Sequence, residues 1–210
     1  MEKTMNGLYT ICEWISKGAW LNLIWLVYLI AGIGLTAVPT AIAAFIVIRK
    51  WLRGETDLKI WRTFHTAFIT ACIKSWKPAL LFTGTLILLM TQAAYFFING
   101  GAHPVQLAAT VLFITVIGGI SLYLFPVWVH YELSFIQIVK QAALIAIISP
   151  LHTLLMAFSA AALVLLFAAI PALIPFFGLV TFAVAFMVPA YHRFIQISRK
   201  KEALQTEMVS

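Results

Sequence analysis

Three long stretches of this chain, residues 18–48, 78–131 and 141–192, contain no lysine or arginine. Each is longer than the roughly 20 residues that an α-helix needs to cross the hydrocarbon core of a bilayer. The whole chain is 63% hydrophobic and only 10% charged, whereas ordinary soluble domains carry about 25% charged residues. The sequence therefore predicts an all-α polytopic membrane protein and excludes an ordinary soluble fold.

The first uncharged stretch is too long for one straight crossing. Its 31 residues would form a helix of about 46 Å, whereas the hydrocarbon core is about 30 Å thick. Gly32, Gly34 and Pro39 are residues that interrupt helices and form turns. We expect a tight hairpin hinged at these three residues, with helices at about 12–33 and 37–53.

A cluster of interfacial residues closes the second of these helices: Arg49, Lys50, Trp51 and Arg53. Excess Lys and Arg stays on the cytoplasmic side of a membrane, and tryptophan prefers the headgroup level. We therefore expect these four residues to anchor the topology and to contact lipid. Gly54 follows them directly and suits a left-handed helix cap.

The positions of the basic residues favour six crossings. Six spans in three hairpins place both termini and all 14 basic residues on the cytoplasmic side. A five-span alternative, in which 18–48 crosses once, leaves Lys3 and Lys17 outside. The remaining spans are expected at about 78–98, 105–130, 150–169 and from the Pro171 turn to Arg193. Together the spans predict one membrane domain over residues 1–198 and a polar cytoplasmic tail over 199–210.

Residues 57–77 have an amphipathic pattern. Their aromatic residues recur at three- and four-residue steps, and Lys, Arg and Thr occupy most of the other side. This pattern predicts a connecting helix on the inner leaflet, and a second amphipathic segment follows His130. As an alternative, the same helix could dock a partner protein through a surface formed by Trp61, Arg62, Phe64 and Phe68, with Glu132 from the second segment.

The chain offers few groups for chemistry. It has one aspartate, Asp57, and its cysteines and histidines show no metal-ligand spacing. We expect no catalytic residue, no metal and no cofactor, and hence a protein that is not an enzyme. The basic residues flank apolar blocks, which argues against nucleic acid and for anionic lipid at the inner leaflet. Within the spans, Asn22 and Gln92 suit interhelical hydrogen bonds better than substrate binding.

Several strings of the sequence resemble the YesL family of small bacterial integral membrane proteins, which is classed as a domain of unknown function. They are Ala19-Trp-Leu-Asn-Leu-Ile-Trp-Leu, Gly32-Ile-Gly, Pro39-Thr-Ala-Ile-Ala-Ala, Arg49-Lys-Trp-Leu-Arg-Gly-Glu, and Tyr123-Leu-Phe-Pro followed by an amphipathic stretch with Glu132. The similarity covers most of residues 5–198. It departs from the family at Val38-Pro-Thr, where Gly-Pro-Ala is more common.

The resemblance implies a role in carbohydrate uptake, because members of the family tend to accompany binding-protein-dependent sugar importers and glycan-degrading enzymes. It implies an accessory or assembly protein that contacts the permease subunits of an ABC importer in the bacterial cell membrane. The alternative is a small-solute transporter or channel that acts through its own helix bundle. The sequence specifies neither a substrate nor an oligomeric state.

Overall fold

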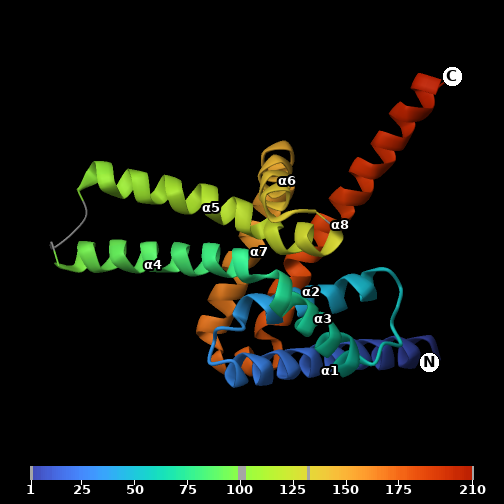
Figure 1. The fold of residues 1–210 in the computed structure, drawn as a ribbon. Helices are drawn as coiled ribbons and strands as arrows, with labels where there is room; N and C mark the ends of the chain where they lie inside the picture. Colours follow the sequence, from blue (N-terminus) through green and yellow to red (C-terminus); the bar gives the residue numbers. More distant parts are fainter. Residues whose placement is uncertain (1, 99–102, 132, 210) are drawn as a thin grey trace.

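The computed structural model describes residues 2–98, 103–131 and 133–209, and this part of the chain is helical without strands (Figure 1). Its helices, in chain order, are α1 (Glu2–Ala31), α2 (Ala37–Leu52), α3 (Ile60–Lys74), α4 (Trp76–Ile98), α5 (Pro104–His130), α6 (Phe135–Ile148), α7 (Pro150–Ala169), the short 3-10 helix η1 (Pro171–Leu173) and α8 (Ile174–Val209). Five segments are long and apolar enough to cross a membrane: Tyr9–Ala31, Trp76–Ile98, Pro104–His130, Pro150–Ala169 and Pro171–Arg199. The all-α polytopic prediction is confirmed.

The helix predicted as the second span is α2, and it is shorter than the helices that correspond to the other predicted spans. Its 16 residues correspond to about 24 Å, less than the roughly 30 Å of hydrocarbon that a straight span must cross. The five long segments match the lower of the two expected numbers of spans. The break between α1 and α2 nevertheless lies where the six-span arrangement required it.

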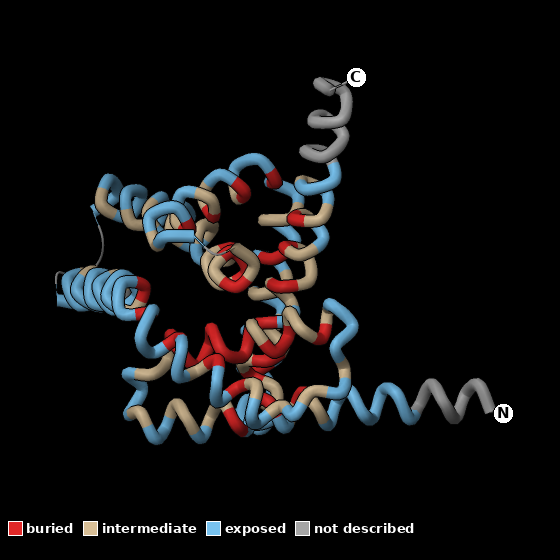
Figure 2. The backbone as a smooth tube through the Cα atoms, turned by 45° about the vertical axis from the view of Figure 1, so that its right-hand side comes forward, coloured by how far each residue is buried: buried red, intermediate tan, exposed pale blue. Residues whose placement is uncertain are grey.

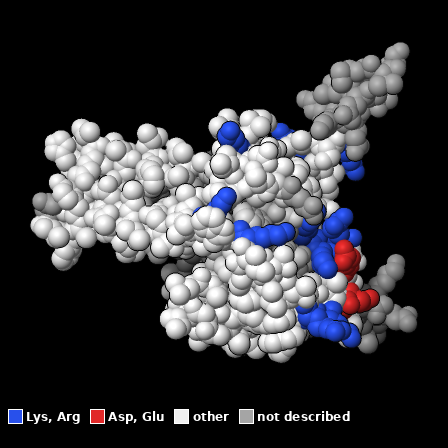
Figure 3. All heavy atoms as spheres, viewed as in Figure 1, with Lys and Arg blue, Asp and Glu red and all other residues white. Residues whose placement is uncertain are grey.

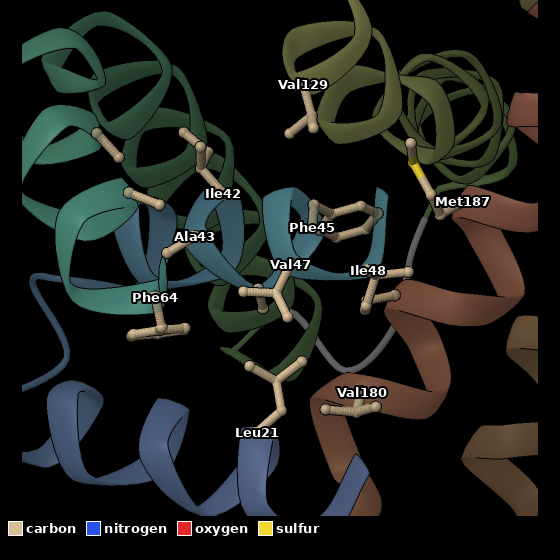
Figure 4. Packing of buried hydrophobic residues seen from close by; sticks show 14 of the residues in the cluster. Leu21, Ile42, Ala43, Phe45, Val47, Ile48, Phe64, Val129, Val180 and Met187 are labelled. Carbon is tan, nitrogen blue, oxygen red and sulfur yellow. The ribbon is translucent and has the colours of Figure 1, made fainter. Parts of the chain in front are cut away.

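α2 forms the centre of the body. Eleven of its 16 residues are buried, and they pack against Leu21 of α1, Phe64 of α3, and Val180 and Met187 of α8 (Figures 2 and 4). Small side chains in the middle of the helix allow its neighbours to approach closely, and these are Ala41, Ala43 and Ala44. A helix surrounded in this way has no single apolar stripe from which its neighbours could be assigned.

The turn between α1 and α2 uses the predicted glycines. Gly34 has a φ of 76° and Ile33 a φ of 51°, a left-handed region that glycine adopts without a steric cost. At Gly32 a Cβ would collide with the side chain of Thr36, whose hydroxyl donates to the Tyr28 carbonyl at 2.9 Å. Pro39 lies in the first turn of α2, and the turn between the two helices falls at these three residues, Gly32, Gly34 and Pro39.

Gly54 ends α2 in the predicted left-handed conformation, with a φ of 89°. Its N–H donates to the Trp51 carbonyl at 3.0 Å, and the Glu55 N–H donates to the Lys50 carbonyl at 3.1 Å. These two bonds form a Schellman motif, which satisfies carbonyls that the helix end leaves without partners. The motif turns the chain back towards α3.

α3 is the predicted amphipathic helix, and it runs back against α2 (Figure 1). Its buried residues Phe64, Ala67 and Ala71 recur at steps of three and four. Phe64, which the alternative interpretation assigned to a partner-docking surface, is fully buried. That prediction is wrong because this apolar stripe lies against α2 and Tyr28 of α1, where burial removes it from solvent or headgroups.

α4 and the first part of α5 form a hairpin that projects from the body (Figure 1). Pro78 is the one buried residue among those α4 residues whose side chains the structure describes, and burial in α5 begins at Tyr123. Figure 3 shows no charged side chain on the projecting part, whereas Lys and Arg gather over the body. α8 also continues to Val209, so the segment predicted as a polar tail extends the last helix.

Candidate functional site

Arg49, at the end of α2, binds the C-terminal end of α5. Its Nη1 donates to the Val129 carbonyl at 2.7 Å, and its Nη2 makes a longer contact of 3.4 Å with the His130 carbonyl. The last carbonyls of a helix have no partner within the helix and carry the negative end of its dipole. A guanidinium at this position therefore stabilises the end of α5 and joins it to α2.

Aromatic side chains complete this junction on the side of α8. The His130 ring lies 4.7 Å from Tyr131, 6.0 Å from Tyr191 and 4.6 Å from Phe194, measured between ring centroids. Phe194 is fully buried. Burial also raises the pKa of the Tyr131 phenol, so this group stays neutral. The contacts fix the end of α5 on α8.

A second junction joins α8 to the corner between α6 and α7. Arg193 Nε donates to the buried Ser149 Oγ at 2.6 Å. Thr153 Oγ1, one turn into α7, lies 3.0 and 3.1 Å from the Ser149 and Ala146 carbonyls, which share its one proton, and 3.4 Å from the Tyr123 hydroxyl. The basic residues at the ends of the spans therefore position helices as well as carrying charge.

Asn22 is a polar residue in the middle of α1, and its side chain is completely buried against α8. Its Nδ2 donates to the carbonyls of Ile174 and Pro175 at 3.2 and 2.7 Å. Its Oδ1 accepts the N–H groups of Leu179 and Val180 at 2.9 and 3.2 Å. One amide thus makes four interhelical hydrogen bonds, which leaves no room for a substrate at this residue.

Gln92 lies on the projecting hairpin, and it has one hydrogen-bond partner in the part of the chain that the structure describes. Gln106 Nε2 donates to Gln92 Oε1 at 3.2 Å, and both side chains are half-buried. This bond joins α4 to α5 far from Asn22. The two intramembrane polar residues of the sequence analysis therefore belong to different parts of the structure.

The predicted topology anchors have three different environments. Lys50 is half-buried and Arg53 is exposed. Trp51 is buried, with its ring 5.6 Å from Trp14 of α1. The prediction that Trp51 contacts lipid headgroups is therefore wrong, because the indole is buried between α1 and α2.

The predicted partner surface is only partly available. Trp61 and Arg62 are exposed and Phe68 is half-buried, whereas Glu132 lies outside the described residues. Trp61 and Phe68 also contact Tyr28 of α1, with centroid distances of 5.6 and 4.8 Å. The Tyr28 hydroxyl lies 2.6 Å from His65 Nδ1, a contact that no motif in the sequence indicated.

Within the described residues, no group of three or more His, Cys, Asp and Glu side chains is arranged to hold a metal ion. Cys12 and Cys72 are both free thiols. Most Ser and Thr hydroxyls donate to carbonyls of their own helix, whereas the polar contacts of Asn22 and Arg49 run from a side chain of one helix to backbone groups of another. They hold helices together, and they define a multi-pass membrane protein whose α-helical body carries a projecting hairpin.

The chain belongs to the family described as "Protein of unknown function, DUF624", whose model matches residues 19–93. The uncharacterized protein YesV of Bacillus subtilis (strain 168) is 32% identical over 195 residues, which cover 90% of this chain and 92% of the relative. The uncharacterized proteins YesL and YteU of the same organism are 28% and 27% identical and cover 72% and 83% of this chain. The matches cover 72% of YesL and 79% of YteU. Membership of the YesL family is thereby confirmed, and no solved structure matches the chain.

Proposed function

We propose that this protein is a non-enzymatic accessory or assembly factor that works beside another membrane protein. The resemblance to the YesL family implies the partner, namely the permease subunits of an ABC importer for carbohydrates. We place the protein in the bacterial cell membrane with both termini cytoplasmic, in accord with the distribution of its basic residues. This arrangement needs an even number of crossings, so it requires α2 to cross as a sixth span beside the five long segments.

The projecting hairpin of α4 and α5 is the observation that carries this proposal. Apolar exposure alone is normal for a helix that faces lipid. This hairpin, however, projects away from the body, and few of its residues are buried. A Cβ added at Gly84, Gly118 or Gly119 would meet no atom within 4 Å. Gly84 and Gly118 are exposed and Gly119 is half-buried, and glycines at such places let a neighbouring helix approach closely in a bilayer.

The environments of the polar residues favour an accessory role over transport. A transporter needs polar groups that are available to a solute within the membrane. Asn22 instead uses its whole amide on the backbone of α8, and Arg49 binds the end of α5. These residues support a structural role for the polar groups of the body.

Filling the open glycines should weaken the partner complex. Gly84→Leu and Gly118→Leu add bulk at two exposed residues where a Cβ would meet no atom of the protein within 4 Å. If a partner helix packs there, we expect roughly tenfold less permease to co-purify from native membranes in mild detergent, which corresponds to about 1.4 kcal/mol of binding free energy. The measurement is quantitative mass spectrometry of the purified complex.

Ala162→Leu supplies the matched control, because Ala162 is also a small exposed residue but lies on α7. It should leave the recovery of the permease unchanged. Recovery that is equal for wild type and both hairpin variants, or absent for the wild type, would contradict the proposal.

A further inference from the structure

A basic groove lies between α2 and α3, on a different surface from the hairpin. Its volume is about 530 Å³, and it is lined by Ile46, Lys50, Lys59, Arg62, Thr63, Thr66, Ala67 and Thr70. The groove therefore combines three cationic side chains with three hydroxyls and an apolar floor. Figure 3 shows that Lys and Arg side chains gather over the body that contains it.

Helical spacing explains why these side chains meet. Lys59, Arg62, Thr66 and Thr70 recur at steps of three and four, which places them along one side of α3. Ile46 and Lys50 are four residues apart on α2. Because α3 packs back against α2, these two rows form the opposite walls of one groove.

The charge of the groove is not balanced by the protein. None of its lining residues is acidic. In the part of the chain that the structure describes, Lys50, Lys59 and Arg62 form no ion pair with a carboxylate, and the ion pair found there joins Lys17 to Glu13. Lys59 is also the N-cap of α3, where the helix dipole is positive and disfavours a further cation. An anion in the groove would offset both effects.

We propose that this groove binds the phosphate group of an anionic phospholipid. Arg62 suits two phosphate oxygens at once, and the two lysines add point charges. Ile46 and Ala67 provide an apolar floor for the first carbons of the lipid.

The test uses the full chain reconstituted into vesicles of equal parts phosphatidylcholine and phosphatidylglycerol, then extracted into mild detergent. Native mass spectrometry measures which lipid stays bound. We expect wild type to retain phosphatidylglycerol over phosphatidylcholine, and the double variant Lys59→Gln/Arg62→Gln to retain about tenfold less. Both residues are exposed, so the change spares the core.

The control is Lys74→Gln/Lys77→Gln, which removes the same charge from exposed residues that do not line the groove. It should retain the lipid as wild type does.

If the control loses as much phosphatidylglycerol as the groove variant, the lipid is held by a general attraction between charges, and the proposed site is overturned. Unchanged retention of lipid by the groove variant would also overturn it. Complete displacement of the lipid by millimolar inorganic phosphate would assign the groove to a free anion and overturn the lipid source. If an acidic protein co-purifies with wild type from native membranes and is lost from the groove variant without loss of lipid, the groove belongs to a protein partner and the proposal is overturned.

Discussion

Asn22→Leu is expected to lower the free energy of unfolding by roughly 2–4 kcal/mol. Each hydrogen bond within a membrane contributes modestly, but the buried backbone groups of α8 would be left without partners, which is costly. The substitution removes four hydrogen bonds between α1 and the first turns of α8. Leucine has a similar volume but cannot bind the backbone groups that it would face. The midpoint of thermal unfolding in detergent, compared with wild type, measures the effect.

Gln92→Leu is the control for this prediction. It also replaces an intramembrane amide, but this amide has one partner at 3.2 Å and is only half-buried. A loss of about 0.5–1 kcal/mol is expected for one such bond. The account of Asn22 fails if the two variants unfold at the same temperature.

Arg49→Met should be the second most damaging substitution, at roughly 2–3 kcal/mol for charge-assisted hydrogen bonds that are lost. It removes the guanidinium that binds the Val129 and His130 carbonyls and so releases the end of α5 from α2. Arg49→Lys keeps the charge without the planar fork, so partial recovery of stability is expected. The same thermal unfolding experiment measures both variants.

Arg53→Met separates this structural role from the effect of charge on topology. Arg53 lies four residues further along and is exposed, so its loss removes the same charge without breaking the contact with α5. We expect it to unfold within about 0.5 kcal/mol of wild type, as surface substitutions usually do. Equal destabilisation by Arg53→Met would mean that Arg49 acts through charge alone.

Local signals were sufficient to predict the helices of this protein and the places where they end. The long uncharged runs, divided at their turn residues, predicted the boundaries of α4, α5 and α7 to within two residues, because apolar residues specify a helix whatever packs against it and turn residues end it. Gly34 and Gly54 were predicted as turn and cap residues because glycine tolerates left-handed backbone. These features depend on neighbours in sequence.

The arrangement of the helices could not be predicted in the same way. α2 is apolar on most of its surface, so its pattern does not reveal that it is the centre of the body. The aromatic stripe of α3 was recognised, but Ala67 and Ala71 join Phe64 in the buried face, and small residues give a weak signal of burial. Which side of an amphipathic helix meets protein and which meets lipid depends on distant segments.

The candidate site shows the same division. The hydrogen bonds of Asn22 were anticipated because a buried amide in a span needs partners. Arg49 was interpreted only as a topology signal, since nothing near it in the sequence indicates the end of α5, about 80 residues away. The contact between Tyr28 and His65 likewise joins segments that no motif connects.

The central claim is that the hairpin of α4 and α5 contacts another membrane protein, and site-specific photocross-linking tests it most directly. A photoreactive amino acid at Ile87, an exposed residue of α4, is activated in intact cells, and the same group at Leu165 on the exposed side of α7 serves as control. We predict a covalent adduct between Ile87 and a permease subunit, and none from Leu165. Adducts from Ile87 that contain only lipid would contradict the account.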